Sequence, residues 1–309
     1  MSGPVTEQDA ALAAGCGCPE PPEVELLPAR EASVGGLAVR RALPRRARRT
    51  VAAWCFADHF GPATPPASMQ VGPHPHTGLA TVTWLVEGEV LHRDSLGSEQ
   101  LIRPGQLNLM SAGHGVSHAE EQTAAGPGAG ALHGIQLWVA QPEATRHGPP
   151  AFEHHAALPS VAVGDAVATV LVGEVGGVRS PARTDTPLVG AEIVLPGGPA
   201  VVPLDARFEH ALVVLDGAIT VGVDRIGPGV LAYLGEGRHD VRVVADGPAR
   251  VMLLGGEPFP EPIIMSWNFV ARAPAEVDRA AREWNAMDPR FGAVDSPLPR
   301  VPAPTPRPT

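Results

Sequence analysis

The chain has 309 residues, of which 44% are hydrophobic, and this length is enough for two domains with separate cores. Its formal net charge of -10 predicts no general attraction to nucleic acid, and no run of about 18 apolar residues predicts a membrane span. All 23 basic residues are arginines, which excludes Schiff-base chemistry and a Walker-type phosphate loop, because both need a lysine.

Glycine and proline each occur 35 times, which favours turns and short strands over long helices. Residues 1–30 lack apolar periodicity, so we expect a flexible N-terminal tail there. The start of the chain lacks the basic and apolar regions of a signal peptide, and we therefore expect a cytoplasmic protein. Three cysteines do not make a disulfide framework: Cys16 and Cys18 are interpreted as an incidental thiol pair, and Cys55 as a core residue.

Apolar runs between Gly36 and Phe60 predict strands that lead into a first domain, with residues 52–56 as a core segment. Six arginines gather in the same region and form what we call the basic cluster: Arg40, Arg41, Arg45, Arg46, Arg48 and Arg49. A solvated strand or loop rim is the favoured interpretation of the basic cluster, and contact with an acidic partner is the alternative.

Two pairs of metal-ligand type lie in the next stretch. His74 and His76 are two residues apart, and His118 and Glu120 repeat that spacing, so each pair points to one side of an extended strand. The alternating apolar runs and turns between the pairs predict several short antiparallel strands that bring them together at one end of a barrel. Three imidazoles and one carboxylate at a single point predict a divalent-metal site with open coordination positions.

Each of these residues also has an ordinary structural interpretation. A single histidine in a β protein is more often exposed or hydrogen-bonded in the core, and Glu120 could belong to a solvated loop. The metal site is favoured for the set because burying such groups is costly unless they are paired or coordinated. For His92 and His133 a core or rim role is favoured over orienting a substrate, and His114 is expected at an exposed turn.

The second half of the chain repeats the first in weaker form. The run from His210 to Val221 parallels that from Thr81 to Val90, which predicts an internal duplication of a β-barrel. Counting along the repeat to the metal-ligand positions reaches Pro203, Asp205 and Arg242, so we expect no catalytic metal there. After Phe269, helical spacing predicts one helix that packs on a barrel, followed by a Pro-rich tail.

These motifs resemble those of a known family. Residues 72–88 read G-P-H-P-H-T-G-L-A-T-V-T-W-L-V-E-G, and residues 104–120 read P-G-Q-L-N-L-M-S-A-G-H-G-V-S-H-A-E. Both runs are similar to the motifs of pirins, a bicupin family that includes bacterial quercetin 2,3-dioxygenase homologues. The resemblance covers roughly residues 36–290.

The resemblance implies an all-β fold of two cupin (jelly-roll-type) barrels in tandem, with a C-terminal helix near the domain junction. The expected division is a flexible tail at 1–30, a metal-binding cupin at 31–145, a linker at 146–180, a degenerate cupin at 181–270, a helix at 271–290 and a Pro-rich tail at 291–309. The implied metal ligands are His74, His76, His118 and Glu120. Ala80 departs from the family, which commonly has an acidic residue there, and this departure affects tuning of the metal more than its binding.

Two functions are compatible with these observations. The first is a dioxygenase that acts with O2 on a flavonol (quercetin-like) or related enol substrate, with Glu120 as the catalytic base. Its cofactor would be one divalent ion, with Fe(II) favoured over Mn, Ni or Zn. The alternative is a non-enzymatic, iron-dependent regulator that binds a transcription factor or metabolic enzyme. We expect no direct nucleic-acid partner and no membrane partner in either case.

Overall fold

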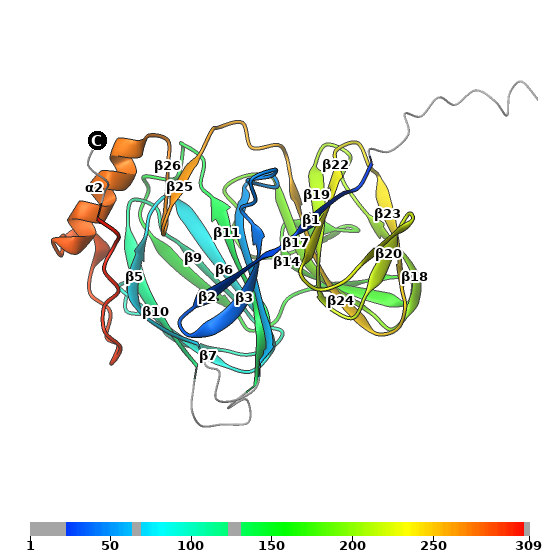
Figure 1. Ribbon diagram of the computed structural model, residues 1–309, viewed down its shortest axis with the longest axis horizontal. Helices are drawn as coiled ribbons and strands as arrows, with labels where there is room; N and C mark the ends of the chain where they lie inside the picture. Colours follow the sequence, from blue (N-terminus) through cyan, green and yellow to red (C-terminus); the bar gives the residue numbers. More distant parts are fainter. Residues whose placement is uncertain (1–22, 64–68, 123–130, 306–309) are drawn as a thin grey trace, which may run out of the picture.

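The computed structural model describes residues 23–63, 69–122 and 131–305. These residues form two β-barrels that lie side by side (Figure 1). Each barrel combines one seven-stranded sheet with one four-stranded sheet, and the strand pairings are antiparallel. The prediction of an all-β fold with two tandem barrels and a C-terminal helix is therefore confirmed.

The first barrel has a large sheet of order β12-β9-β6-β11-β4-β3-β2 and a small sheet of order β5-β10-β7-β8. The strands of the large sheet are β2 (Arg30–Val34), β3 (Leu37–Leu43), β4 (Trp54–Ala63), β6 (Leu79–Glu87), β9 (Leu107–Ser111), β11 (Leu132–Ala140) and β12 (Ala151–His155). Those of the small sheet are β5 (Gln70–His76), β7 (Val90–Asp94), β8 (Glu99–Ile102) and β10 (Val116–Gln122).

The second barrel repeats this topology, with orders β1-β22-β19-β24-β17-β14-β13 and β18-β23-β20-β21. The strands of its large sheet are β1 (Glu25–Pro28), β13 (Ser160–Val163), β14 (Ala166–Val172), β17 (Leu188–Leu195), β19 (Glu209–Asp216), β22 (Val230–Gly235) and β24 (Ala249–Gly256). Those of its small sheet are β18 (Gly198–Pro203), β20 (Ile219–Val221), β21 (Asp224–Ile226) and β23 (Asp240–Ala245).

The start of the described chain belongs to the second barrel. Strand β1 pairs with β22 at the edge of that barrel, the position that β12 takes beside β9 in the first. Residues 25–28, which were expected to belong to the tail, instead form a strand whose Leu27 is buried in the core between the barrels. Residues Cys16 and Cys18 lie outside the described residues.

Residues 146–180 are not the linker that the prolines suggested. They contain β12, which completes the first barrel, and β13 and β14, which belong to the second. A short hairpin of β15 (Glu174–Val175) and β16 (Val178–Arg179) follows. The alternating residues Ala166, Ala168 and Val170 are buried, so β14 is a core strand of the second barrel. The prolines of residues 146–180 lie directly before strands, where no hydrogen bond of a strand ladder is lost.

The chain then returns to the first barrel. A hairpin of β25 (Ile264–Ser266) and β26 (Phe269–Ala271) leads into α2 (Pro274–Asn285) and the short 3-10 helix η1 (Pro289–Phe291). Helix α2 lies on the face of the first barrel remote from the second, so the expected place near the domain junction is wrong (Figure 1). No helix among the described residues is long and apolar enough to cross a membrane.

The described part of the C-terminal segment makes specific contacts with the first barrel, which a frayed Pro-rich tail would lack. Trp284 of α2 is buried, and its indole N–H donates to the Val301 carbonyl at 2.8 Å. The backbone N–H of Val301 donates in turn to the Pro73 carbonyl on β5 at 2.9 Å. Residues 298–303, which we call the C-terminal strap, are thereby held against the strand that carries His74.

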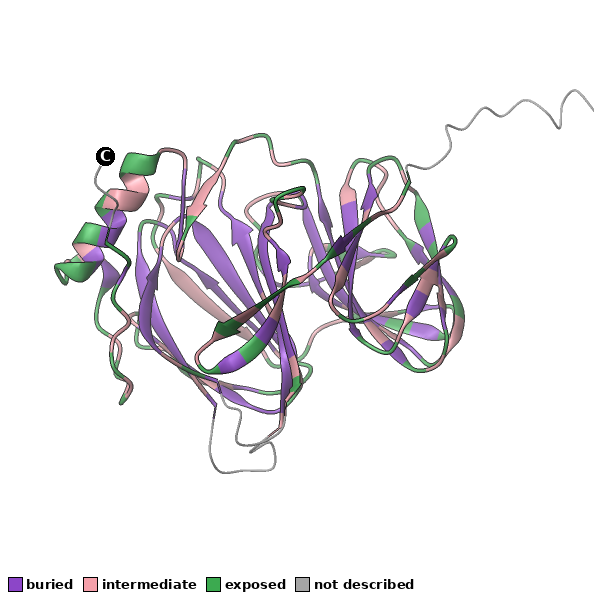
Figure 2. Cartoon of the chain, viewed as in Figure 1, coloured by how far each residue is buried: buried purple, intermediate pink, exposed green. Residues whose placement is uncertain are grey.

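An apolar core joins the two barrels, and Figure 2 shows the strands on either side of it as largely buried. Trp54 of β4 is fully buried there, and its indole N–H donates to the carbonyls of Val189 and Gly255 at 3.2 and 3.1 Å. Glu209 of the second barrel accepts the backbone N–H of Ala52 at 2.5 Å. The two barrels therefore share one core instead of meeting through a solvated interface.

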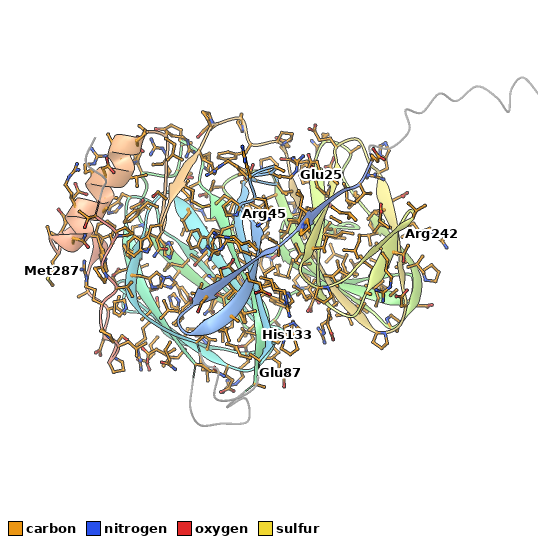
Figure 3. The ribbon with its side chains drawn as sticks, in the orientation of Figure 1. Glu25, Arg45, Glu87, His133, Arg242 and Met287 are labelled. Carbon is orange, nitrogen blue, oxygen red and sulfur yellow. The ribbon has the colours of Figure 1, made fainter. Side chains whose placement is uncertain are left out.

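Two histidines are buried at the same junction. The Nε2 atoms of His59 and His133 are 3.0 Å apart, and His133 Nε2 lies 3.2 Å from the Leu215 carbonyl of the second barrel. His133 is labelled near Glu87 in Figure 3, at the side where the barrels meet. Burial, together with the nearby His133 and Arg40, lowers the pKa of His59 to about 3. The folded protein therefore keeps His59 neutral at pH values where the unfolded chain protonates it.

This difference predicts a pH-dependent stability. Because the pKa of His59 is lower in the folded state than its usual 6.5, the free energy of unfolding falls as the pH drops from about 6.5 towards 3. Between pH 7 and 5 His59 alone contributes a loss of about 2 kcal/mol. Urea unfolding of the wild type and of His59→Gln at both pH values measures this loss. The free energy of unfolding should decrease less between pH 7 and 5 in His59→Gln than in the wild type.

The exposed His147 provides the control, since His147→Gln should leave the decrease unchanged. An equal decrease in the wild type and His59→Gln would show that His59 is not held neutral by the junction.

Candidate metal centre

The sequence-predicted residues meet on two adjacent strands. His74 and His76 end β5, while His118 and Glu120 lie on β10, and the ladder between them pairs His118 with His74. A register shift between His118 and Glu120 bends β10 at this point. All four side chains are buried, with exposed fractions from 1% to 7%. The two pairs thus lie on neighbouring strands: His74, His76 and His118 meet in one group of candidate ligands, whereas Glu120 falls in a second group with His92 and His118.

The imidazoles have the separation that a bound ion requires. His76 Nε2 and His118 Nε2 are 3.0 Å apart, and the ring centroid of His74 lies 4.3 Å from that of His118. One ligand atom each from His74, His76 and His118 lie within 4.8 Å of one another. Two nitrogens at about 2.1 Å from an ion and at right angles around it would be about 3.0 Å apart. The donor set therefore fits a divalent ion.

Backbone carbonyls fix the orientation of two rings. His74 Nδ1 lies 2.9 Å from the Gly72 carbonyl, and His76 Nδ1 lies 3.1 Å from the Asn268 carbonyl. A carbonyl can only accept, so each ring must donate from Nδ1 and present the lone pair of Nε2. Both Nε2 atoms then face the same point. Asn268 is in the turn of the β25–β26 hairpin, so a segment that follows the second barrel helps to form the site of the first.

The third ring is fixed by a residue that the sequence interpretation did not assign to the site. His118 Nδ1 lies 3.4 Å from His92 Nδ1, and His92 Nε2 lies 3.1 Å from Asp94 Oδ2. The carboxylate accepts from His92 Nε2, which leaves His92 Nδ1 to accept from His118 Nδ1. His118 therefore also presents Nε2, so all three rings use the same nitrogen. His92 is a positioning residue in this arrangement.

A second group of candidate ligands overlaps the first. Atoms of His92, His118 and Glu120 also lie within 4.8 Å of one another. The hydrogen bonds favour the set of His74, His76 and His118, because the Asp94–His92–His118 chain uses His118 Nδ1 and leaves Nε2 for the ion. The signal that could have identified His92 is the His-Arg-Asp run at 92–94, which repeats the i, i+2 spacing on β7 beside β10.

Burial sets the charge of the site. It lowers the pKa of His74 to about 4 and the pKa of His76 and His118 well below the usual 6.5. These rings are therefore neutral at neutral pH, which is the form that binds a metal. Burial raises the pKa of Glu120, although a hydrogen bond from the Thr83 hydroxyl at 3.4 Å acts in the opposite direction.

A cavity of about 540 Å³ opens beside these residues, and His74, His76, His118 and Glu120 all line it. Its wall contains the stacked rings of Phe56 and Trp138, whose centroids are 4.0 Å apart. The Trp138 ring also meets the His76 ring edge-on at 5.0 Å. An aromatic surface thus begins directly at a candidate metal ligand.

Polar groups line the remainder of this cavity. Arg41 forms a two-pronged ion pair with the buried Asp58, at 2.8 and 2.6 Å, and its guanidinium lies over the Phe56 ring. Gln136 accepts from the Thr83 hydroxyl at 2.9 Å. The cavity therefore offers both apolar ring surface and polar groups to a small molecule.

Other sequence expectations have different outcomes. Ala80 packs in the core between the barrels, so the missing acidic group would not have stood in the wall of this cavity.

His114 is exposed, as expected of a turn residue. Burial raises the pKa of the Cys55 thiol to about 12, in keeping with a core role. Within the described ranges, both candidate groups of metal ligands lie in the first barrel.

Comparison with known proteins assigns the family. The pirin family model matches residues 36–139, and the model of the pirin C-terminal cupin domain matches residues 193–292. The chain belongs to the pirin family. Pirins have the two-cupin fold, which agrees with the two barrels described above.

Individual relatives cover most of the chain. A Pseudomonas aeruginosa protein that carries the provisional name quercetin 2,3-dioxygenase is 44% identical over 94% of this chain and 93% of its own. Human pirin is 30% identical over 81% of this chain and 88% of its own. A crystal structure titled quercetin 2,3-dioxygenase from Acinetobacter baumannii is 42% identical, with a TM-score of 0.88 over 92% of this chain and 96% of that one.

The two candidate ligand groups make different predictions for metal binding. Replacing His74 removes a ligand from the favoured group, so His74→Ala should abolish binding of one Fe(II) per chain. Replacing His92 or Asp94 removes only the support of His118, so His92→Ala and Asp94→Asn should retain one ion with an affinity about 10–100-fold weaker. Anaerobic competition with a chromophoric chelator measures both stoichiometry and affinity.

The exposed Asp246, which pairs with Arg225 on the second barrel, provides the control variant Asp246→Asn. Full loss of binding in His92→Ala with retention in His74→Ala would reverse the assignment and select the group of His92, His118 and Glu120.

Proposed function

We propose that this pirin is a mononuclear metal-dependent dioxygenase that acts on a flavonol-like or related enol substrate. The observation that carries the proposal is a group of three neutral imidazoles, with the buried carboxylate of Glu120 beside His118, in the lining of one cavity. Three neutral ligands and one carboxylate leave coordination positions open on an ion such as Fe(II). Relatives that share 42–44% of its sequence bear the name quercetin 2,3-dioxygenase, which supports the same substrate class.

The walls of the cavity suit a planar, hydroxylated substrate. Phe56 and Trp138 are stacked on each other and give the cavity an apolar surface, and Gln136 and the Arg41–Asp58 pair offer polar groups at the periphery. A volume of about 540 Å³ lies in the range of cavities that enclose molecules of this size. Both partners of the Arg41–Asp58 pair lie in one cavity, so this wall has little net charge and favours a neutral substrate over a highly charged one.

When bound, the divalent ion supplies Lewis acidity and open positions for oxygen ligands. Glu120 is the residue that would accept the proton of the substrate hydroxyl, because its carboxylate lines the same cavity as the three imidazoles. The Thr83 hydroxyl lies 3.4 Å from a Glu120 oxygen and 2.9 Å from the Gln136 side-chain oxygen, and its single proton can be donated to only one of them at a time. With a flavonol, one O2 is consumed and the central ring opens with release of carbon monoxide.

The regulator alternative depended on the basic cluster, and the structure engages half of that cluster internally. Arg41 pairs with Asp58, and Arg40 donates to the Gly61 carbonyl at 2.9 Å. Arg48 pairs with Glu25 at 2.8 Å, so it links the first barrel to strand β1 of the second. These contacts give the cluster a structural use, and we therefore retain the dioxygenase as the proposal. A cytoplasmic location stays a prediction.

The proposal predicts oxygen uptake when the Fe(II)-loaded protein is mixed with quercetin anaerobically and then exposed to O2. Glu120→Gln cannot accept the proton, so its rate of uptake should fall by about 100-fold or more. The matched control is Glu121→Gln on the opposite face of β10, where the carboxylate pairs with Arg93 and Ser296. Its rate should stay within about twofold of the wild type.

An oxygen electrode and product analysis give the readout. If wild-type uptake does not exceed that of His76→Ala, the dioxygenase proposal is wrong. If Glu120→Gln retains the wild-type rate, the reaction proceeds without Glu120 as its base.

A further inference from the structure

The second barrel has a cavity of its own. It measures about 690 Å³, and the residues that line it come from the β15–β16 hairpin, the segment from Pro203 to Phe208, and the chain around His239. Its lining includes none of the four predicted metal ligands. The first and second cavities therefore belong to different barrels.

One buried polar side chain, that of His210, lines this cavity. The side chain is only 1% exposed, and its Nδ1 atom makes no hydrogen bond of good geometry, although the Phe208 backbone also interacts with the ring. Burial lowers the pKa of His210 to about 4, so the ring is neutral at neutral pH. A buried polar atom without a partner is costly, and a ligand that hydrogen-bonds to it would remove that cost.

Glycine at position 255 allows the His210 ring to lie where it does. A Cβ atom at Gly255 would be 2.5 Å from His210 Cδ2, which is too close for any side chain at that position. The Gly255 carbonyl also accepts the indole N–H of Trp54 in the first barrel. His210 is therefore packed against the rigid junction between the barrels, and its place in the cavity is well defined.

The remaining lining indicates the class of ligand. Leu253, Val189 and Phe208 give the cavity apolar walls, and the Phe208 ring centroid lies 6.0 Å from that of His210. The cations Arg207 and Arg179 are paired with Asp205 and Glu174.

These ion pairs are exposed and leave little net charge to attract a polyanion such as a phosphate ester. An apolar patch beside one buried neutral imidazole, bordered by paired charges, instead suits an aromatic ring that carries a hydroxyl. A hydroxyl both donates and accepts, so it can pair with Nδ1 in either tautomer of His210.

We propose that this cavity is a second small-molecule site, separate from the metal centre, that binds a hydroxylated aromatic compound through a hydrogen bond to His210. The site does not depend on the proposed dioxygenase activity. Because its wall adjoins the Trp54 contacts of the junction, a bound molecule would lie against the shared core of the two barrels.

Calorimetric titration of the full-length protein with 2-naphthol tests the proposal, with 2-methylnaphthalene as the matched probe that lacks the hydroxyl. The wild type and His76→Ala should both show a site that prefers 2-naphthol, because His76 belongs to the other cavity. In His210→Phe that site should bind 2-naphthol at least tenfold more weakly, and 2-methylnaphthalene with unchanged affinity.

A second variant guards against a general loss of structure in His210→Phe. Thr184 is exposed and lines the same cavity, so Thr184→Trp should block the site while the core stays intact, as thermal unfolding would verify. The proposal is overturned if neither the wild type nor His76→Ala binds 2-naphthol, if His210→Phe or Thr184→Trp binds it as the wild type does, or if 2-methylnaphthalene binds the wild type as tightly as 2-naphthol.

Discussion

The metal centre depends on the hydrogen bond that each imidazole ring donates from Nδ1, on the side of the ring away from the ion site. Backbone carbonyls accept the Nδ1 protons of His74 and His76, and the Asp94–His92 pair accepts that of His118. Each ring is left with one free nitrogen, and these three nitrogens face one point. Burial keeps the rings neutral, so protons do not compete with an ion at neutral pH. A ring without such a partner could rotate and would lose this alignment.

This requirement explains why the site of the first barrel involves later parts of the chain. The Asn268 carbonyl lies in a hairpin that follows the second barrel, and the C-terminal strap bonds to Pro73 beside His74. Gly72 allows the strap to approach, because a Cβ there would lie 2.0 Å from the Pro299 carbonyl oxygen. The junction core around Trp54 and the edge strand β1 join the barrels further. The two barrels and the strap therefore act as one support for the metal centre.

The sequence predicted the features that depend on local periodicity. Alternating apolar residues gave the strands, the i, i+2 pairs gave His74, His76, His118 and Glu120, and the repeat gave two barrels. It did not predict contacts between distant segments. Strand β1 looked like part of a tail because four residues carry little periodic signal, and its partner β22 lies some 200 residues away. Prolines made residues 146–180 look like a linker, although they lie at the ends of strands.

The role of His92 was missed for the same reason. His92 and Asp94 share strand β7 at an i, i+2 spacing, but only the packing of β7 beside β10 shows that this pair orients His118. The cavity around His210 could not be seen either, since the second half lacks the paired histidines that marked the first. The role of His92 and the cavity beside His210 both arise from tertiary packing, which a sequence repeat does not predict.

A crystal structure of the Fe(II)-loaded protein, with anomalous diffraction recorded at the iron edge, tests the central claim most directly. The account predicts one iron peak per chain at about 2.1 Å from the Nε2 atoms of His74, His76 and His118, with a Glu120 oxygen as the fourth protein ligand. An iron peak bonded to His92, or one that leaves His74 outside bonding distance, would contradict it.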